Sequence, residues 1–480
     1  MFMKTVHWIA FLMSVAICSA SQFNPATDWF HKAGYGIFVH YLEDVQNDTN
    51  QVHSLGKQTS WDDCVKEFDV KKFADAMAQA NAGYVIFTMH QRTRFLIAPN
   101  ETFNKLTGYK PGEACATRDL VEDLYTALNK KHIPLMLYWT GDGPREDEKA
   151  AKALGWSQPV SVDYVEKWAA VVREYGERYG KKVAGWWVDG CYPFIGYNEE
   201  RLGILADALK AGNKDRIIAL NPGVQQKVQF YTVYDDYTCG EQNNFLDIPA
   251  SRWVNGVQWH ILSFLGCGSS HIGAAWGMPG TKYSKSDLID YVADVNQAGG
   301  VVSIDVLLYR DGALDRSQLE VLKPLRPGIN SLKKREPFPP GNLAFRKPAR
   351  LLSLDGTREL SVNSGVHFPR LGVDGRMNTY ALAGGEWPWT YEVDLLKPVN
   401  ISRIKVNFSK GFATELKITV SVDRKEWKQV AAAKDLDGKP FECKFEPVLA
   451  EFVRVSALKP DGPNQKGTQM SIAELEVYEK

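Results

Sequence analysis

The stretch Val183-Ala184-Gly185-Trp186-Trp187-Val188-Asp189-Gly190-Cys191 reads as a short buried strand that ends on a carboxylate followed by a glycine. An apolar strand that stops on Asp-Gly inside a protein predicts an aspartate at a pocket floor, and the glycine lets the chain turn away without a crowding side chain. Trp186 and Trp187 would suit the walls of such a pocket, because flat apolar rings fit the faces of sugar rings. The alternative is a turn aspartate with two core tryptophans.

This strand belongs to a series in which apolar strands alternate with amphipathic helices. Further strands are expected at residues 36–41, 83–89, 133–139 and 217–221, and less regular ones near Val233, at 270–275 and at 301–308. Helices are expected at residues 70–81, 119–130, 161–179 and 200–211. Eight such units with nearly continuous apolar strands indicate an α/β fold, a (β/α)8-type (TIM-like) barrel.

Polar side chains stand where the predicted strands end. In parallel barrels the chemistry gathers at the carboxyl ends of the strands, which favours a functional site over a set of unrelated turns. For each histidine the alternative is a core imidazole bonded to backbone, and a metal site built on the histidines and Asp189 lacks the spacing of any metal motif. The residues in question are His40, His90, Tyr138, Asp189, Asn221 and Glu241.

Composition narrows the class of protein. The 480 residues allow a large domain and a smaller one, and the balance of 57 basic against 57 acidic residues gives no charge that would favour nucleic acid or an anionic membrane surface. Aromatic residues make up 12% of the chain, with 14 tryptophans, which favours carbohydrate or another flat ligand.

The N-terminus has the pattern of a secretory signal peptide over residues 1–20, with Lys4 before an apolar run that is too short for a membrane span. It predicts a secreted or periplasmic protein. Ile17 before Cys18 argues against lipid anchoring, which prefers a smaller residue there, and no other segment is expected to cross a membrane. The six later cysteines have no paired spacing for zinc or thiol exchange, so scattered buried thiols are expected.

A charged, proline-rich linker over residues 336–344 separates the predicted catalytic domain, 21–335, from a second domain, 345–480. There the hydrophobic period drops toward two, which predicts an all-β jelly-roll sandwich. The stretches 373–380 and 387–395, with Ser421-Val-Asp-Arg-Lys-Glu-Trp, resemble the discoidin, or coagulation-factor type C, domain. The resemblance implies a structural calcium ion near Asp374, and such domains often bind glycans.

The barrel segments, in order, resemble the α-L-fucosidase family of glycoside hydrolases over about residues 25–330. Gly185-Trp-Trp-Val-Asp189-Gly190 is similar to the family's Trp-x-Asp-Gly segment, and Asp236-Tyr-Thr-Cys-Gly-Glu241-Gln242 to its Asp-Tyr-x-Thr-Pro-Glu-Gln. The openings of the first three units and the closing Tyr309-Arg-Asp-Gly312 are similar too. The resemblance implies a glycosidase.

Cleavage of a glycosidic bond needs one charged carboxylate and one carboxyl group that can donate a proton. Asp189 is the candidate nucleophile, which would form a covalent glycosyl-enzyme, and Glu241 is the candidate acid/base. The family's acid/base varies in its sequence position, so three other carboxyl groups stay open for that role. They are Asp235, Asp236 and Asp247.

The resemblance also implies a set of substrate-binding residues. His40 matches a first-strand histidine that contacts sugar hydroxyls, and His90 the first of a second-strand pair. The others are Trp61, Gln91, Tyr138, Trp187 and Trp276.

The departures from the family pattern lie around the sugar pocket. Tyr41-Leu42 replaces Trp-Gly, Gln91 replaces the second histidine of the pair, and Gly240 replaces a proline. Arg92 and Arg94 enter the loop after the second strand, either to receive an anionic group or to face solvent. The sequence therefore predicts a retaining exo-acting glycosidase on terminal α-L-fucose or a modified or related sugar, with no cofactor required. The alternatives are a galacto-configured or anionic substrate and a non-catalytic carbohydrate-binding relative.

Overall fold

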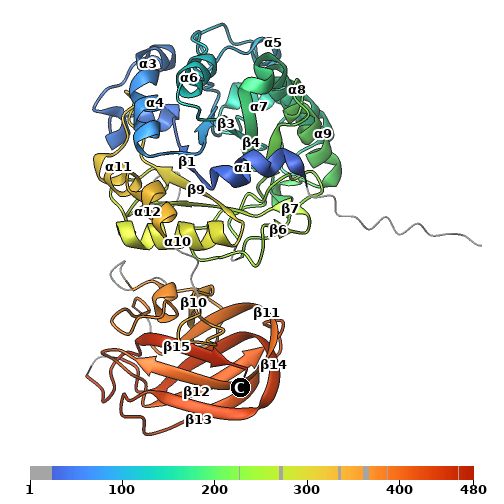
Figure 1. Cartoon of the computed structure of the whole chain (residues 1–480). Coiled ribbons are helices and arrows are strands. Elements are labelled where there is room, and N and C mark those ends of the chain that lie inside the picture. The colour runs from blue at the N-terminus through green and yellow to red at the C-terminus, as the bar shows by residue number, and fades with distance from the viewer. Residues whose placement is uncertain are drawn as a thin grey trace, which may run out of the picture.

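The computed structural model describes residues 24–225, 227–269, 274–332, 337–360, 367–385, 387–462 and 464–479. Within them the chain forms a parallel α/β domain followed by an antiparallel β-sandwich, two bodies that stand apart in Figure 1. The predicted signal peptide and the first residue of the predicted linker lie outside the described residues. Among the described helices none combines the length and the apolar character that a membrane crossing needs.

Seven parallel strands form the central sheet of the described α/β domain, in the order β5-β4-β3-β2-β1-β9-β8. Nearly all of their residues are buried, because helices cover the outer face and side chains fill the inner one. The TIM-like class is confirmed. The strands are β1 (Tyr35–Val39), β2 (Val85–Thr88), β3 (Leu135–Thr140), β4 (Val183–Asp189), β5 (Ile217–Leu220), β8 (His260–Phe264) and β9 (Val301–Val306).

The predicted strand near Val233 is wrong, and the described end of the predicted strand 270–275 is not a strand. Val233 lies in an exposed turn, and Ala274 and Ala275 lie in another turn, while the rest of the predicted strand 270–275 falls outside the described residues. The strand that this part of the chain supplies is β8, which had not been predicted. A short hairpin, β6 (Trp253–Val254) with β7 (Val257–Gln258), precedes it.

The irregular segment 235–242 takes the place of a strand between β5 and β8. Asp236 N donates to Ile218 O at 2.8 Å, and Leu262 N donates to Gly240 O at 3.0 Å. Glu241 forms an isolated parallel bridge with Leu262. Because this segment bonds to both neighbouring strands, it joins the two edges of the curved sheet and carries Glu241 to the same end as Asp189.

Helices surround the sheet (Figure 1). The predicted helix 70–81 is α4, and the Asp69 carboxylate accepts a bond from Lys72 N at its start, as expected of an N-cap. The helices are α1 (Asp28–Ala33), α2 (Glu43–Gln46), α3 (Trp61–Glu67), α4 (Val70–Gln79), α5 (Glu101–Thr107), α6 (Leu120–Asn129), α7 (Glu148–Leu154), α8 (Val162–Tyr179), α9 (Glu199–Leu209), α10 (Lys285–Gln297), α11 (Arg316–Leu322) and α12 (Leu325–Ser331).

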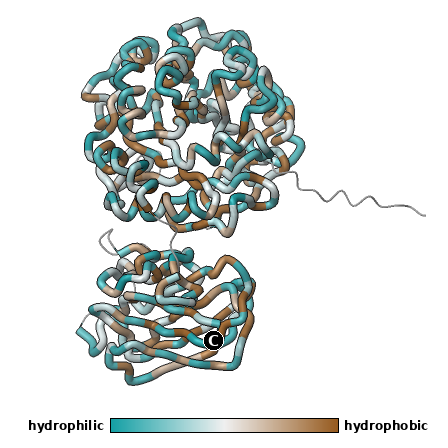
Figure 2. Tube along the Cα trace, viewed as in Figure 1, coloured by the Kyte–Doolittle hydropathy of each residue, from teal (hydrophilic) through white to brown (hydrophobic). Residues whose placement is uncertain are grey.

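The C-terminal domain is an antiparallel sandwich with its own apolar core. Brown segments recur between teal ones along its strands in Figure 2, as expected of strands with one buried face. Its strands are β10 (Ala349–Ser353), β11 (Trp389–Phe408), β12 (Glu415–Ser421), β13 (Lys428–Ala433), β14 (Phe441–Lys459) and β15 (Ile472–Tyr478).

Ion pairs join the two domains. Arg346 of the second domain lies 2.5 Å from Asp294 of α10, and Arg350 lies 3.3 Å from Asp247. Arg350 and Asp247 are both buried, so the second pair is shielded from solvent screening. These contacts fix the sandwich to the barrel, and in Figure 1 α10 is the labelled barrel helix nearest to the sandwich.

Candidate active site

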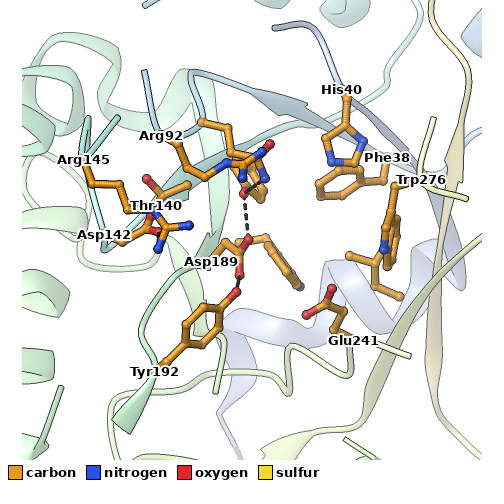
Figure 3. Close-up of a pocket in the computed structure, with 14 residues that line it drawn as sticks. Phe38, His40, Arg92, Thr140, Asp142, Arg145, Asp189, Tyr192, Glu241 and Trp276 are labelled. Atoms are coloured by element: carbon orange, nitrogen blue, oxygen red, sulfur yellow. Dashed lines mark hydrogen bonds and ion pairs between the residues drawn. The ribbon is translucent and has the colours of Figure 1, made fainter. Parts of the chain in front are cut away.

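A cavity of about 170 Å³ opens at the carboxyl ends of the strands (Figure 3). Two carboxyl groups, Asp189 and Glu241, face each other across it, with aromatic rings along its walls. Side chains of β1, β3, β4 and β8, and of the loop that follows β2, line it, so these strand ends meet at one place. The lining residues are Phe38, His40, Gln91, Arg92, Tyr138, Thr140, Asp142, Arg145, Trp187, Asp189, Tyr192, Glu241, Leu262 and Trp276.

Asp189 is held by four hydrogen bonds at the end of β4. Its Oδ1 accepts from Gly190 N at 2.8 Å, Tyr192 Oη at 2.7 Å and Asn221 Nδ2 at 2.9 Å. Its Oδ2 accepts from Tyr138 Oη at 2.8 Å. The left-handed backbone of Gly190 (φ 67°) sends the chain away beneath the carboxylate. Four donors from four positions fix the orientation of this group toward the cavity.

Glu241 shares a donor with Asp189. Asn221 Nδ2, which bonds to Asp189, also donates to Glu241 Oε2 at 2.7 Å. The Oδ1 and Oε2 atoms therefore lie at most 5.6 Å apart, the sum of the 2.9 and 2.7 Å bonds. Burial and the negative charge of Asp189 raise the pKa of Glu241 to about 8. Glu241 thus keeps its proton near neutral pH, and it lies beside Asp189, whose carboxylate accepts hydrogen bonds.

The shared donor gives a testable expectation for Asn221→Ala. The Asn221 bond holds the pKa of Glu241 down, so its loss raises that pKa and moves the alkaline limb of kcat/KM upward. We expect kcat/KM to fall between about tenfold and a hundredfold, because two carboxyl groups lose a hydrogen bond. A pH–rate profile measures both effects, and Asn129→Ala on the exposed end of α6 is the matched control. An alkaline limb that stays in place or moves down would contradict the shared-donor geometry.

Aromatic rings and a histidine form one wall of the cavity. The ring of Trp187 stacks on Tyr138 at 5.5 Å between centroids, and its Nε1 donates to Cys239 O. His40 Nδ1 lies 2.9 Å from Asp305 Oδ1, so its other nitrogen, Nε2, is left for a ligand. Trp276 stands beside the His40 ring at 6.2 Å (Figure 3). This wall offers apolar faces and one polar atom, the combination that a sugar ring needs.

Two predicted substrate-binding residues lie outside the cavity lining. His90 is buried behind it, 4.5 Å from the ring of Trp139 and 5.0 Å from that of Trp168, and burial lowers its pKa to about 3. Trp61 begins α3, where its Nε1 donates to Leu96 O at 3.0 Å. Both are core side chains, which is the alternative that the sequence left open for the histidines. Gln91 does line the cavity and donates to Tyr138 Oη at 2.9 Å.

The three other acid/base candidates are bonded elsewhere. Asp235 accepts from Leu220 N, Asp236 from Ile218 N and Lys210, and Asp247 from Val228 N. None of these three is among the residues that line the cavity. Of the four carboxyl groups that the sequence left open, Glu241 alone reaches it.

The two loop arginines lie in different places. Arg92 lines the cavity and pairs with Glu146 at 3.2 Å, whereas Arg94 Nη1 donates to Asp147 at 2.8 Å outside the lining. A further pair, Arg145 with Asp142 at 3.1 Å, lines the cavity and was not predicted.

Sequence reasoning missed several functional positions. Asn221 was recognised as a strand end but given no role, and Asp142 follows β3 in Thr140-Gly-Asp-Gly, an Asp-Gly signal like that of Asp189. Tyr192 lies three residues beyond Asp189, a spacing that carries no signal alone. Asp305 lies inside β9, where a carboxylate in an apolar run is itself a signal, since burial there requires a partner.

No group of three or more His, Cys, Asp or Glu side chains suited to a metal ion occurs among the described residues. Near Asp374, where calcium was expected, the carboxylate accepts bonds from Arg376 N and Thr379 Oγ1, and Gly375 N donates to Glu474. These hydrogen bonds bring the Asp374 and Glu474 carboxyl groups to the same loop, and a calcium ion there stays a prediction.

The comparisons with known proteins agree with this geometry. Residues 13–326 match the family model of alpha-L-fucosidase, which is more than half of the chain. The chain belongs to the α-L-fucosidase family of glycoside hydrolases. Residues 359–475 match the F5/8 type C domain, which confirms the predicted second domain. This family member therefore pairs a glycoside hydrolase domain with a discoidin-type sandwich.

Solved structures match the chain at low identity. A putative alpha-L-fucosidase of Bacteroides thetaiotaomicron is 14% identical, with 94% of this chain and 96% of that one covered and a TM-score of 0.44. A glycoside hydrolase family 29 fucosidase of Ruminococcus gnavus in complex with fucose is 15% identical, with coverage of 95% and 94% and a TM-score of 0.44. A chitosan-binding module of Paenibacillus sp. in complex with chitotriose is 29% identical over 28% of this chain and 99% of that one, with a TM-score of 0.25. The search of curated proteins gave no match.

Proposed function

We propose that this family member removes terminal α-L-fucose, or a closely related sugar, from glycans with net retention of configuration. The observation that carries the proposal is the pair Asp189 and Glu241, joined through one amide of Asn221. An oxygen separation of at most 5.6 Å matches retaining glycosidases, whose carboxyl groups stand about 5–5.5 Å apart, rather than inverting ones, which need about 6.5–9.5 Å. A cavity that encloses one ring supports exo-action.

Two displacements follow from these roles. Asp189 attacks the anomeric carbon while Glu241, protonated near neutral pH because its pKa is about 8, gives its proton to the leaving oxygen. The glycosyl ester removes the negative charge of Asp189, which is one cause of the raised pKa of Glu241. The pKa of Glu241 then falls, so the same group accepts a proton from the water that releases the sugar.

The test is release of nitrophenol from a panel of aryl glycosides. We expect 4-nitrophenyl α-L-fucoside to be the best substrate, ahead of the α- and β-galactosides. Preference for another sugar would support a glycoside hydrolase with a different substrate. Binding of fucosides without turnover would favour a non-catalytic carbohydrate-binding protein. The signal-peptide pattern of residues 1–20 supports action outside the cytoplasm, in a secreted or periplasmic setting.

The arginines of the cavity favour a second candidate, a fucoside that carries an anionic group such as a sulfate. Arg92 and Arg145 present two guanidinium groups at the cavity, each a fork of donors suited to an oxyanion. Each is paired with a carboxylate, Glu146 or Asp142, that an anionic substrate would replace. Burial raises the pKa of Asp142 to about 6, so its negative charge is lost on mild acidification.

Arg145→Met tests this candidate. We expect the ratio of kcat/KM for a sulfated aryl fucoside to that for the unsulfated one to fall at least about tenfold, the worth of one charge-assisted hydrogen bond. Arg94→Met is the matched control, since that guanidinium bonds to Asp147 outside the cavity lining. An equal change in kcat/KM for the two substrates would show that Arg145 stabilises the loop and does not bind the anionic group.

A further inference from the structure

A groove runs between the barrel and the β-sandwich, next to the active-site cavity. It consists of two adjoining hollows of about 440 and 320 Å³. Both are lined by Asn244 and Leu246 from the barrel and by Glu359 and Leu360 from the second domain, so the hollows are continuous. The two domains therefore share one surface depression.

Two chain positions and one ring contact place the groove beside the catalytic pair. Gln242, which lines the groove, directly follows Glu241. Phe264 lines the groove from β8, two residues beyond Leu262 of the cavity and so on the same face of the strand. Its ring packs edge to face at 4.8 Å on Trp276, which lines the cavity, so the groove and the cavity adjoin at these two rings. The groove thus begins on the Glu241 side, where the leaving oxygen must lie to receive its proton.

The chemistry of the groove suits sugar hydroxyls. Asn244 Oδ1 accepts from Lys282 Nζ at 3.2 Å, and Lys282 also lies 3.5 Å from the centre of the Phe264 ring. Glu359 lines the same groove from the second domain. It lies 3.9 Å from Arg350, and its carboxyl group is only partly buried. Amide, ammonium and carboxyl groups around an apolar ring provide donors, acceptors and a flat face, the set that binds an oligosaccharide.

A buried ion pair fixes the two walls of the groove to each other. Arg350 Nη2 of the second domain lies 3.3 Å from Asp247 Oδ1, and Asp247 Oδ2 accepts from Gln242 Nε2 at 2.8 Å. The wall that the sandwich supplies is therefore tied to the residue next to Glu241. Such a wall is pre-organised for binding and does not have to assemble around the ligand.

We propose that this groove binds the leaving-group portion of a fucosylated oligosaccharide, and that the β-sandwich completes the subsite through Glu359 and Leu360. The proposal rests on the proposed function and names the part of the substrate that the cavity itself does not enclose. It makes the second domain part of the substrate site and ties glycan selectivity to the docking of the two domains.

The experiment compares Asn244→Ala/Glu359→Gln with the parent on 2′-fucosyllactose and on 4-nitrophenyl α-L-fucoside. The expected result is that the ratio of kcat/KM for the trisaccharide to that for the aryl fucoside falls at least about tenfold, or about 1.4 kcal/mol. Asn129→Ala/Glu177→Gln, on exposed helical positions of the barrel, is the matched control and should keep the parent ratio.

Two readouts separate the proposal from its premise. The parent's own rate on the aryl fucoside tests the proposed function. The ratio in the groove variant tests the subsite, and the melting temperature of the variant shows that it is folded. An unchanged ratio in a folded variant overturns the subsite. So does titration calorimetry on Asp189→Ala protein if 2′-fucosyllactose binds no more tightly than fucose, or if the groove substitutions leave its affinity unchanged.

Discussion

Asp189→Ala is expected to lower kcat/KM for 4-nitrophenyl α-L-fucoside at least about a thousandfold, a loss of roughly 4 kcal/mol of transition-state stabilisation. The reason is geometric: four donors orient this carboxylate toward the cavity, and the amide of Asn221 holds it within 5.6 Å of Glu241, from the sum of 2.9 and 2.7 Å. Nitrophenol release by parent and variant measures the effect.

The control for this variant is Asp163→Ala, which removes an exposed carboxylate of α8 that pairs with Lys167. Azide should restore turnover to Asp189→Ala, because a small anion can enter the space of the lost side chain and attack the same face of the sugar. The product would be the fucosyl azide of inverted configuration. Equal rates in parent and variant would remove Asp189 from the reaction.

Glu241→Gln is expected to have the second largest effect, and one that depends on the leaving group. A general acid contributes about 10²–10⁴-fold, so turnover of 2′-fucosyllactose should fall by that order, while the aryl fucoside, whose phenol leaves readily, should lose less. Because Glu241 must carry a proton to act and its pKa is about 8, parent activity should fall as the pH rises through that value.

The pH–rate profile of Glu241→Gln should lack this alkaline limb, since glutamine does not titrate. Glu177→Gln on α8 is the matched control and should keep it. If the limb persists in Glu241→Gln, or if both substrates lose activity equally, the acid is another group and Glu241 has a structural role.

The sequence predicted the parts of the fold that obey a period. Strands β1 to β5 are nearly continuous apolar runs, β9 was expected as a less regular one, and Asp189-Gly190 at the end of β4 indicated the centre of the site. Strand β8 was not predicted, because it begins with His260 and follows a long irregular stretch without helical or strand periodicity. The closing segment 235–242 has no periodic signal, and scattered hydrogen bonds to β5 and β8 hold it in place of a regular strand.

The candidate site was predictable where side chains stand at strand ends, as with His40 and Tyr138. The sequence did not predict whether a side chain after a strand faces the cavity or the core. His90 also follows a strand, yet it packs in the core against Trp139 and Trp168. Contacts between distant loops were equally hidden. The Arg145–Asp142 pair and the groove between the domains depend on how loops and domains dock, which local sequence does not encode.

The most direct test of the account is to trap the glycosyl-enzyme with 2-deoxy-2-fluoro-α-L-fucosyl fluoride. The fluorine at carbon 2 disfavours the oxocarbenium-like transition states of both steps, and the activated leaving group speeds the first, so the ester accumulates. Peptide mapping by mass spectrometry should find the fluorofucosyl group on the peptide that contains Asp189, and no label in Asp189→Ala. A label on any other residue, or turnover of the reagent with release of fluoride and no covalent adduct, would contradict a double displacement through Asp189.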